Sequence, residues 1–458
     1  MTSMQTVKAD IAVIGAGTAG LSAFHTLKAA GKRVVLIDRG PLGTTCARVG
    51  CMPSKAILHA GKQWATASNL SAGATLSNES PKALWRGAQQ TRDALANGAA
   101  ERTRKAAGDA LIMAEAHFVA PNVLHAGTQR IEAGAFIVAT GSSPVIPGTL
   151  KHVQQEVLTT DTLFELDELP RNLGVLGLGA IGLELGVAMS RFGVKVTAAD
   201  QRETIGGISD PEVLARAKSE FDKEIEMWLG TSVNVSTDDG FILMRAGERS
   251  SRVDKLLVVA GRAPNTGTLN LSAAGVVVDH AGMVTIDPAT MQAGCPSIFF
   301  AGDVQPNRPL QHEAADEGTL AARAALSYLA NTSRAVNARR VPISILFTDP
   351  DICSVGLSHE AAAEQGAIIG QADGTGNGRS KVIGATGNLL RIYVAPKTGI
   401  LLGGSMILTQ GEHIAHLLAW AIQARQTVND LLTMPFYHPS IEELLQSALK
   451  SALAQMTK

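Results

Sequence analysis

The chain has 458 residues, 45% of them hydrophobic and 18% charged, and its formal net charge at pH 7 is -1. This length predicts about three domains with cores of their own. The near-zero charge gives no electrostatic basis for binding nucleic acid or an anionic membrane surface. Four cysteines are too few for a secreted disulfide scaffold, and no apolar run reaches the ~18 residues of a membrane helix.

A dinucleotide-binding pattern opens the chain. The first predicted strand begins by about Ala9, so we expect no targeting segment and a cytoplasmic protein. After this strand come a glycine-rich turn, an apolar-periodic helix to about Ala30, and a second strand that ends at Asp38. The turn contains Gly15, Gly17 and Gly20. Glycines here let the backbone approach a pyrophosphate at the helix N-terminus, and the acid accepts hydrogen bonds from a ribose.

The same pattern recurs later in the chain. Its turn contains Gly177, Gly179 and Gly182 and is followed by a helix to about Phe192 and a strand that ends at Asp200. From Gly177 to Asp200 is 23 residues, the same spacing as from Gly15 to Asp38. Two bound dinucleotides in one polypeptide imply electron transfer between them.

A cysteine pair follows the first copy. Cys46 and Cys51 lie near two cations, Arg48 and Lys55, and cations or a helix N-terminus favour the reactive thiolate. Five residues of ideal helix rise ~7.5 Å, beyond the ~7 Å reach of a disulfide, so a bridge here needs a distorted turn. From these residues alone, two inert buried cysteines remain equally possible. The isolated Cys295 and Cys353 are predicted to be inert core residues.

The remaining segments complete the predicted organisation. Strands that end near Thr140-Gly141 and Ala260-Gly261 close the two copies, and residues 63–108 are predicted as one or two surface helices. A further strand reaches Gly302-Asp303 and precedes a helix over about Glu313–Leu329. After a polar linker at 330–340 we expect an α+β module, with strands at Ile343–Phe347, Leu389–Val394 and Leu401–Ile407 and helices at Glu412–Ala424 and Ile441–Ala454.

With these motifs in this order, the chain resembles the class I flavin pyridine nucleotide–disulfide oxidoreductases, a family that includes lipoamide dehydrogenase, glutathione reductase and mercuric reductase. The resemblance is closest to the first and covers essentially the whole chain. It rests on both glycine patterns and on residues 45–55, 139–141, 261–265, 301–303, 347–350 and 438–443. It implies an α/β fold: two Rossmann-like dinucleotide-binding domains, for FAD and NAD, plus a C-terminal α+β dimerisation domain. The implied parts are 1–148 and 272–340 for FAD, 149–271 for NAD(P), and 341–458 for dimerisation.

The resemblance also implies residue roles. Cys51 faces the flavin, Cys46 is the outer interchange thiol, and Lys55 pairs with Glu184 near the flavin. His438 and Glu443 match an acid–base dyad that reaches the other subunit's disulfide across a homodimer interface. Asp303 holds the ribityl chain of FAD. The other cofactor-binding residues are Gly15, Gly17, Gly20, Asp38, Lys55, Thr140 and Gly141 for FAD, and Gly177, Gly179, Gly182, Asp200 and Gly261 in the second unit. No metal site is implied.

The implied reaction is oxidation of dihydrolipoamide, with electrons passing through Cys46 and Cys51 and FAD to NAD+. Asp200 favours NAD because it repels a 2′-phosphate, whereas Arg202 keeps NADP open. Arg48 stands where the family usually has Asn, beside the interchange thiol, and leaves the substrate open. The dithiol is therefore either a small molecule or a lipoyl group on a partner protein.

Several alternatives remain. One is an NAD(P)H-dependent reductase of another small disulfide or other oxidant. Mercuric reductase is disfavoured because no cysteine pair follows Cys353. A non-enzyme alternative is an FAD- and NAD-binding redox sensor. The joint presence of the proposed catalytic residues, Cys46, Cys51, Lys55, Glu184, His438 and Glu443, argues against it.

Overall fold

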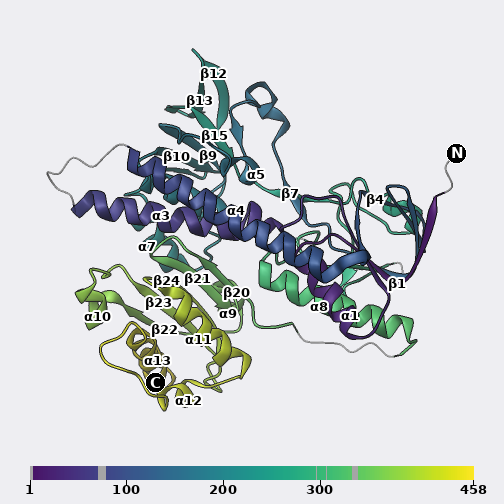
Figure 1. Cartoon of the computed structure of the whole chain (residues 1–458). Helices are drawn as coiled ribbons and strands as arrows, with labels where there is room; N and C mark the ends of the chain where they lie inside the picture. Colours follow the sequence, from purple (N-terminus) through teal and green to yellow (C-terminus); the bar gives the residue numbers. More distant parts are fainter. Residues whose placement is uncertain (1–3, 71–78, 295–296, 306, 333–338, 458) are drawn as a thin grey trace.

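The computed structural model describes residues 4–70, 79–294, 297–305, 307–332 and 339–457. Three α/β regions surround a pair of long helices, α3 (Cys51–Leu70) and α4 (Glu79–Ala107) (Figure 1). The predicted core position Cys295 lies outside the described residues. Within the described ranges, no helix is long and apolar enough to cross a membrane.

The first region is built on a nine-stranded sheet in the order β17-β18-β19-β6-β1-β2-β3, in which β5 also pairs with β6 and β4 pairs with β5. Strand β1 starts four residues before the predicted run because Gln5–Lys8 pairs with the first residues of β6, and ladder hydrogen bonds do not need apolar side chains. The strands are β1 (Gln5–Ile14), β2 (Val34–Asp38), β3 (Leu111–Met113), β4 (Ala116–Ala120), β5 (Val123–Ala126), β6 (Gln129–Val138), β17 (Ile286–Asp287), β18 (Gln292–Ala293) and β19 (Ile298–Phe300).

Two helices of this region lie side by side although they are far apart in the sequence. They are α1 (Thr18–Ala29) and α8 (Gln311–Leu329). A Cβ atom on Gly318 would lie 2.1 Å from the carbonyl oxygen of Ala19, so only glycine permits this approach. Since β19 also pairs with β6 in the first sheet, we propose that residues 272–340 return to the first domain.

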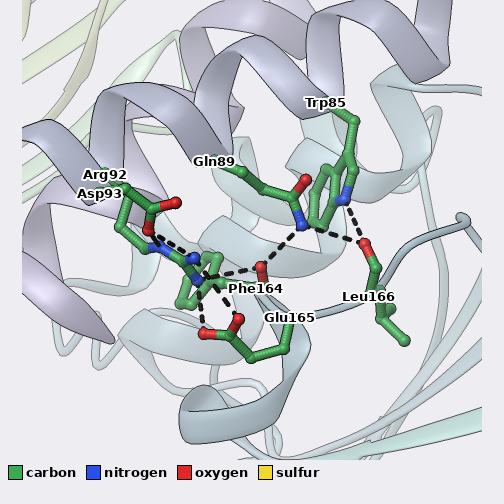
Figure 2. Close-up of polar contacts among 7 residues, drawn as sticks. All are labelled: Trp85, Gln89, Arg92, Asp93, Phe164, Glu165 and Leu166. Atoms are coloured by element: carbon green, nitrogen blue, oxygen red, sulfur yellow. Dashed lines mark hydrogen bonds and ion pairs between the residues drawn. The ribbon is translucent and has the colours of Figure 1, made fainter.

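The prediction that residues 63–108 form surface helices is wrong for one face of α4. Trp85 is fully buried there, and its ring packs edge-on against Phe192, with the ring centroids 5.8 Å apart. Figure 2 shows side chains of α4 reaching the segment after α5 (Thr160–Leu163). Trp85 Nε1 donates to the carbonyl of Leu166 at 2.8 Å, and Arg92 donates to that of Phe164 at 3.0 Å. These bonds satisfy carbonyls at and beyond the end of a short helix, which have no partner within it.

The second region has a five-stranded parallel sheet in the order β11-β10-β9-β15-β8, with helices α6 and α7. A three-stranded antiparallel meander, β12-β13-β14, was not predicted, and a small ladder of β7 and β16 links this region to the first. The bounds are β7 (Ser142–Pro144), β8 (Val157–Leu158), β9 (Asn172–Leu176), α6 (Ala180–Arg191), β10 (Lys195–Asp200), α7 (Pro211–Phe221), β11 (Glu226–Leu229), β12 (Asn234–Asp238), β13 (Phe241–Ala246), β14 (Arg249–Val253), β15 (Lys255–Val258) and β16 (Arg262–Pro264).

The C-terminal region is an antiparallel sheet in the order β20-β21-β24-β23-β22. Strands β21 and β22 were not predicted. The bounds are β20 (Ile343–Leu346), β21 (Asp351–Gly356), α9 (His359–Glu364), β22 (Ile368–Asp373), α10 (Gly378–Val382), β23 (Leu389–Val394), β24 (Leu401–Leu408), α11 (Gly411–Gln423), α12 (Val428–Leu432) and α13 (Glu443–Met456). A buried network docks this sheet on the second region: Asp210 accepts hydrogen bonds from Arg391 at 2.9 Å and Tyr393 at 2.7 Å.

Candidate active site

The two glycine turns have nearly identical backbones. Gly15 and Gly177 adopt φ values of 105° and 102°, a region that favours glycine. A Cβ on Gly20 would lie 1.8 Å from the carbonyl oxygen of Gly15, and a Cβ on Gly182 would lie 1.8 Å from that of Gly177. Helices α1 and α6 have no side-chain hydrogen bond at their N-caps. Each turn therefore offers free helix N–H groups and the close backbone approach that a dinucleotide pyrophosphate needs.

The terminal acid of each copy is held by backbone amides. Asp38 accepts hydrogen bonds from the N–H groups of Ala16 and Gly40, both at 2.6 Å. The side chain of Asp200 accepts from the N–H of Leu178 at 2.8 Å and from that of Arg202 at 2.9 Å.

Arg202 distinguishes the second acid from the first, because its guanidinium also pairs with Asp200 at 3.1 Å. Burial acts to raise the pKa of Asp200, but the hydrogen bonds from Arg202 and Leu178 outweigh it, so the pKa is lowered. Asp200 is therefore a carboxylate at neutral pH, and it forms an ion pair with the exposed guanidinium of Arg202.

Two adjoining cavities run from the first glycine turn to the cysteines. The first encloses about 360 Å³ and is lined by the first glycine turn, Asp38, Thr140 and Arg48. The second encloses about 260 Å³ and is lined by Cys46, Cys51, Lys55, Glu184 and Asp303. Because both are lined by Gly17, Thr45, Val49, Ala139, Gly141 and Arg262, they form one extended channel. The channel joins the first glycine turn to the cysteines, an arrangement that fits an extended dinucleotide.

The cysteine pair occupies a helix break. Helix α2 (Thr45–Arg48) ends before Val49, whose φ is -138°, and α3 begins at Cys51. This break is the distorted turn that a disulfide between Cys46 and Cys51 would need. Both cysteines are half-buried free thiols. The hydrogen bond from Cys46, with the positive charge of Lys55, lowers the pKa of Cys51 to about 7, whereas the same bond and burial raise the pKa of Cys46.

An ion pair crosses from the first region to the second beside this thiol. Lys55 Nζ lies 2.9 Å from both carboxylate oxygens of Glu184, whose side chain is only 8% exposed. The N–H of Phe347 donates to Glu184 at 2.9 Å, and the Phe347 ring centroid lies 4.9 Å from Lys55 Nζ. The C-terminal region thus helps to hold the pair. The Phe347 contacts were not predicted.

Asp303 lines the cysteine cavity just after β19. Burial raises the pKa of its carboxyl, and the nearby charge of Arg262 opposes this effect. The preceding Gly302 N–H donates to Glu317 at 2.8 Å, and Glu317 in turn pairs with Arg339. Neither Glu317 nor Arg262 was predicted individually as a site residue, although an acid within the apolar pattern of α8 is a signal that could have identified Glu317.

The remaining predicted cofactor residues lie at the junction of the two cavities or close to it. Thr140 and Gly141 line the first cavity, and the Thr140 hydroxyl donates to the carbonyl of Asn265 at 2.8 Å. Gly261 precedes β16 with a φ of 155°. Cys353 is fully buried, as predicted, and burial raises the pKa of its thiol.

The predicted dyad forms away from the cysteines. His438 Nδ1 lies 3.0 Å from Glu443, and the N–H of Ser440 donates to the same carboxylate at 3.0 Å. The hydrogen bond with His438 lowers the pKa of Glu443. The His438 side chain is 78% exposed. Neither residue of the dyad lines the cysteine cavity of this same chain, so far as the chain is described.

Comparisons with known proteins agree with this arrangement. Residues 9–318 match the family described as pyridine nucleotide-disulphide oxidoreductase, and residues 342–449 match the dimerisation domain of that family. Dihydrolipoyl dehydrogenase from Geobacillus stearothermophilus is 28% identical, with 98% of this chain and 97% of the relative covered. The enzyme of that name from Halobacterium salinarum is 30% identical, with 97% and 96% covered.

A solved structure has the same fold over nearly its whole length. The Cu(II) complex of the HOCl-induced flavoprotein disulfide reductase RclA from Escherichia coli superposes with a TM-score of 0.83 at 25% identity. The match covers 97% of this chain and 99% of that one. The doubly repeated dinucleotide fold and the C-terminal module predicted from the sequence are thereby confirmed.

Proposed function

Because this chain belongs to the pyridine nucleotide-disulphide oxidoreductase family, we propose that it oxidises dihydrolipoamide or a lipoyl group on a partner protein, with NAD+ as the final acceptor. The observation that carries the proposal is the lowered pKa of Cys51 beside Cys46, in the same cavity as Asp303 and the Lys55–Glu184 pair. The dihydrolipoyl dehydrogenases at 28–30% identity favour this dithiol over others.

The family uses FAD and a pyridine nucleotide, and the channel from Gly15 to Asp303 fits the first of these. When bound, FAD would take two electrons from a dithiol and pass a hydride to the nicotinamide. We propose that Gly15, Gly17, Gly20 and Asp38 hold its adenosine diphosphate part and that Asp303 binds the ribityl chain. Lys55 and Glu184 then keep a fixed charge beside the flavin part of the channel.

The chain's own chemistry is thiol–disulfide exchange. A substrate thiolate attacks Cys46 of the oxidised pair, so that a mixed disulfide forms and Cys51 leaves as a thiolate. The second substrate thiolate displaces Cys46, the substrate departs as a disulfide, and both cysteines are reduced. The low pKa of Cys51 makes it the better leaving group and leaves a large fraction of it as thiolate at pH 7 and above.

A base must take the substrate's thiol proton. His438 is a suitable base because Glu443 holds its Nδ1 and leaves Nε2 to accept the proton. Since this dyad is exposed and lies away from the cysteines of its own chain, we propose that it serves the cysteines of a second copy in a homodimer. The match of residues 342–449 to the dimerisation domain supports this arrangement.

We propose NAD rather than NADP as the second cofactor, bound at Gly177, Gly179, Gly182, Asp200 and Gly261. The amide-bound carboxylate of Asp200 suits a ribose 2′-OH and repels a 2′-phosphate. Arg202 already pairs with Asp200, so the positive charge of Arg202 is partly neutralised and attracts a 2′-phosphate less.

The decisive assay compares turnover of dihydrolipoamide with NAD+ or NADP+ against turnover of glutathione disulfide with NADH or NADPH. The proposal requires the dihydrolipoamide–NAD+ pair to give the highest kcat/KM. Preference for another disulfide or oxidant would instead support the reductase alternative, which the likeness to RclA favours. Absence of turnover with retained FAD and NADH binding would support the sensor alternative.

The base assignment has its own test. We expect His438→Gln to slow dithiol oxidation by about 100-fold or more, within the range of general-base contributions, while FAD content and flavin reduction by NADH stay unchanged. Stopped-flow measurement of both half-reactions separates these steps. Unchanged dithiol oxidation would contradict the assignment.

A further inference from the structure

Arg48 lies between the two cysteines in the sequence, yet it lines the first cavity and not the one that contains the thiols. It is half-buried at the end of α2. A Cβ on Gly43 would lie 3.2 Å from Arg48 Cδ and 2.8 Å from the carbonyl oxygen of Ala96. Gly43, with a φ of 119°, therefore leaves the room through which the arginine stem reaches the cavity.

The three arginines that line this cavity differ in their partners. Arg39 pairs with Glu115 at 3.8 Å, and its side chain is 59% exposed. Arg262 donates to the hydroxyl and the carbonyl of Ser142 at 2.9 and 2.7 Å. Arg48 makes no ion pair or hydrogen bond with any part of the chain that the structure describes. A half-buried guanidinium without a partner is costly, because five N–H donors lose water without compensation.

The same cavity is also lined by the N-terminus of helix α1. There the first turn of α1 presents its free N–H groups at Gly17, and Asp38 already accepts hydrogen bonds from two amides. The cavity thus has a free guanidinium and a free helix N-terminus lining the same space. Both favour a phosphate, and a guanidinium can bind two phosphate oxygens at once.

We propose that Arg48 binds the pyrophosphate of the bound FAD and is a major determinant of FAD affinity in this protein. This inference rests on the proposed function only in that FAD occupies the first cavity. It assigns Arg48 to cofactor binding and separates it from the choice of disulfide substrate, despite its position beside Cys46 in the sequence.

The test measures equilibrium binding of two probes, FAD and riboflavin, to protein stripped of flavin. Flavin fluorescence reports the binding. For Arg48→Gln we expect the Kd for FAD to rise about 10- to 100-fold, the range of charge-assisted hydrogen bonds. The Kd for riboflavin, which has no phosphate, should stay within about twofold. Arg39→Gln, which removes an exposed arginine from the same cavity, should change the Kd for FAD by less than about threefold.

Two further measurements keep the proposal open to refutation if Arg48→Gln folds poorly. Arg48→Lys keeps the charge but loses the planar, two-pronged guanidinium, and it should raise the Kd for FAD by more than Arg39→Gln does. Rising salt should weaken binding of FAD to the native protein more than binding of riboflavin, because only FAD carries charged phosphates.

The outcomes are distinguishable. An unchanged Kd for FAD in Arg48→Gln overturns the inference, and so does equal weakening of FAD and riboflavin, which indicates a structural role. A changed rate of Cys46 alkylation with unchanged FAD affinity also overturns it. If the native protein itself binds no FAD, the proposed function fails first.

Discussion

The two nucleotide-binding units share one backbone pattern and differ in a few side chains. Gly15, Ala16, Gly20 and Asp38 have counterparts 162 residues later in Gly177, Leu178, Gly182 and Asp200, with matching hydrogen bonds and the same close approach of strand and helix. Even the second amide that binds each acid corresponds, at Gly40 and Arg202.

The differences begin with the side chains at corresponding positions. Ser22 of α1 corresponds to Glu184 of α6, which reaches Lys55 in the first region. Gly40 precedes a proline and the loop to the cysteines, whereas Arg202 turns back onto Asp200. The shared backbone thus gives both units the geometry that a dinucleotide pyrophosphate needs. The side chains of Glu184 and Arg202 distinguish the second unit, since they contact Lys55 and Asp200.

The largest effect should come from the shared glycines. Gly20→Ala and Gly182→Ala each place a Cβ 1.8 Å from a carbonyl oxygen, and we expect each to cost about 3 kcal/mol of stability. The losses of function should differ: Gly20→Ala loses FAD, and Gly182→Ala keeps FAD but is not reduced by NADH. Flavin absorbance measures how much FAD each variant retains, and anaerobic titration with NADH measures whether the retained flavin is reduced. If both variants lost the same cofactor, the division of labour between the units would be wrong.

The next effect concerns the position at which the copies diverge. Glu184→Gln leaves Lys55 without its anionic partner, so we expect flavin reduction by NADH to slow about tenfold, equal to ~1.4 kcal/mol of activation free energy. The matched control is Ser22→Ala at the corresponding position of the first unit, which should stay within about twofold. Stopped-flow absorbance measures both, and equal rates in the two variants would remove the role of Glu184.

A pH effect belongs to the first unit alone, because only its loop leads to thiols. In the reduced protein, Cys51 should ionise with a midpoint near pH 7 and be a thiolate above it. Cys46→Ala removes the hydrogen bond that contributes most to this lowered pKa, so the midpoint should move upward toward 9.0. Cys46→Ser keeps a hydroxyl donor and should shift it less. Thiolate absorbance against pH is the measurement, and an unmoved midpoint in Cys46→Ala contradicts the assigned cause.

The smallest expected effect is at Arg202, which corresponds to Gly40. Arg202→Ala removes an exposed guanidinium from Asp200. If NAD is the coenzyme, the KM for NADH should stay within about threefold, since exposed ion pairs contribute ~0.2–1 kcal/mol. Any residual use of NADPH should fall, because the carboxylate then repels a 2′-phosphate unopposed. A large loss of NADH use would mean that Arg202 contacts the coenzyme directly.

The sequence by itself determined the two dinucleotide turns, because a strand, a glycine turn, a helix and an acid at fixed spacing depend only on local backbone geometry. Its likeness to a known family also predicted the C-terminal module, which the match over residues 342–449 confirms, and suggested residues for the thiol chemistry, which stay a proposal. Strands β21 and β22 and the meander β12-β13-β14 were missed, since the apolar pattern of short strands is weak without the sheet that pairs them.

Only the tertiary structure decided contacts between residues distant in the chain. It buried Trp85 of α4 and placed Phe347 on the Lys55–Glu184 pair. It also placed Arg48 in the lining of the first cavity, although Arg48 lies between Cys46 and Cys51 in the sequence. The physical reason is that burial, charge pairing and pKa depend on which surfaces meet in three dimensions. The spacing of residues along the chain predicts local helices, strands and turns, but not which of them pack against one another.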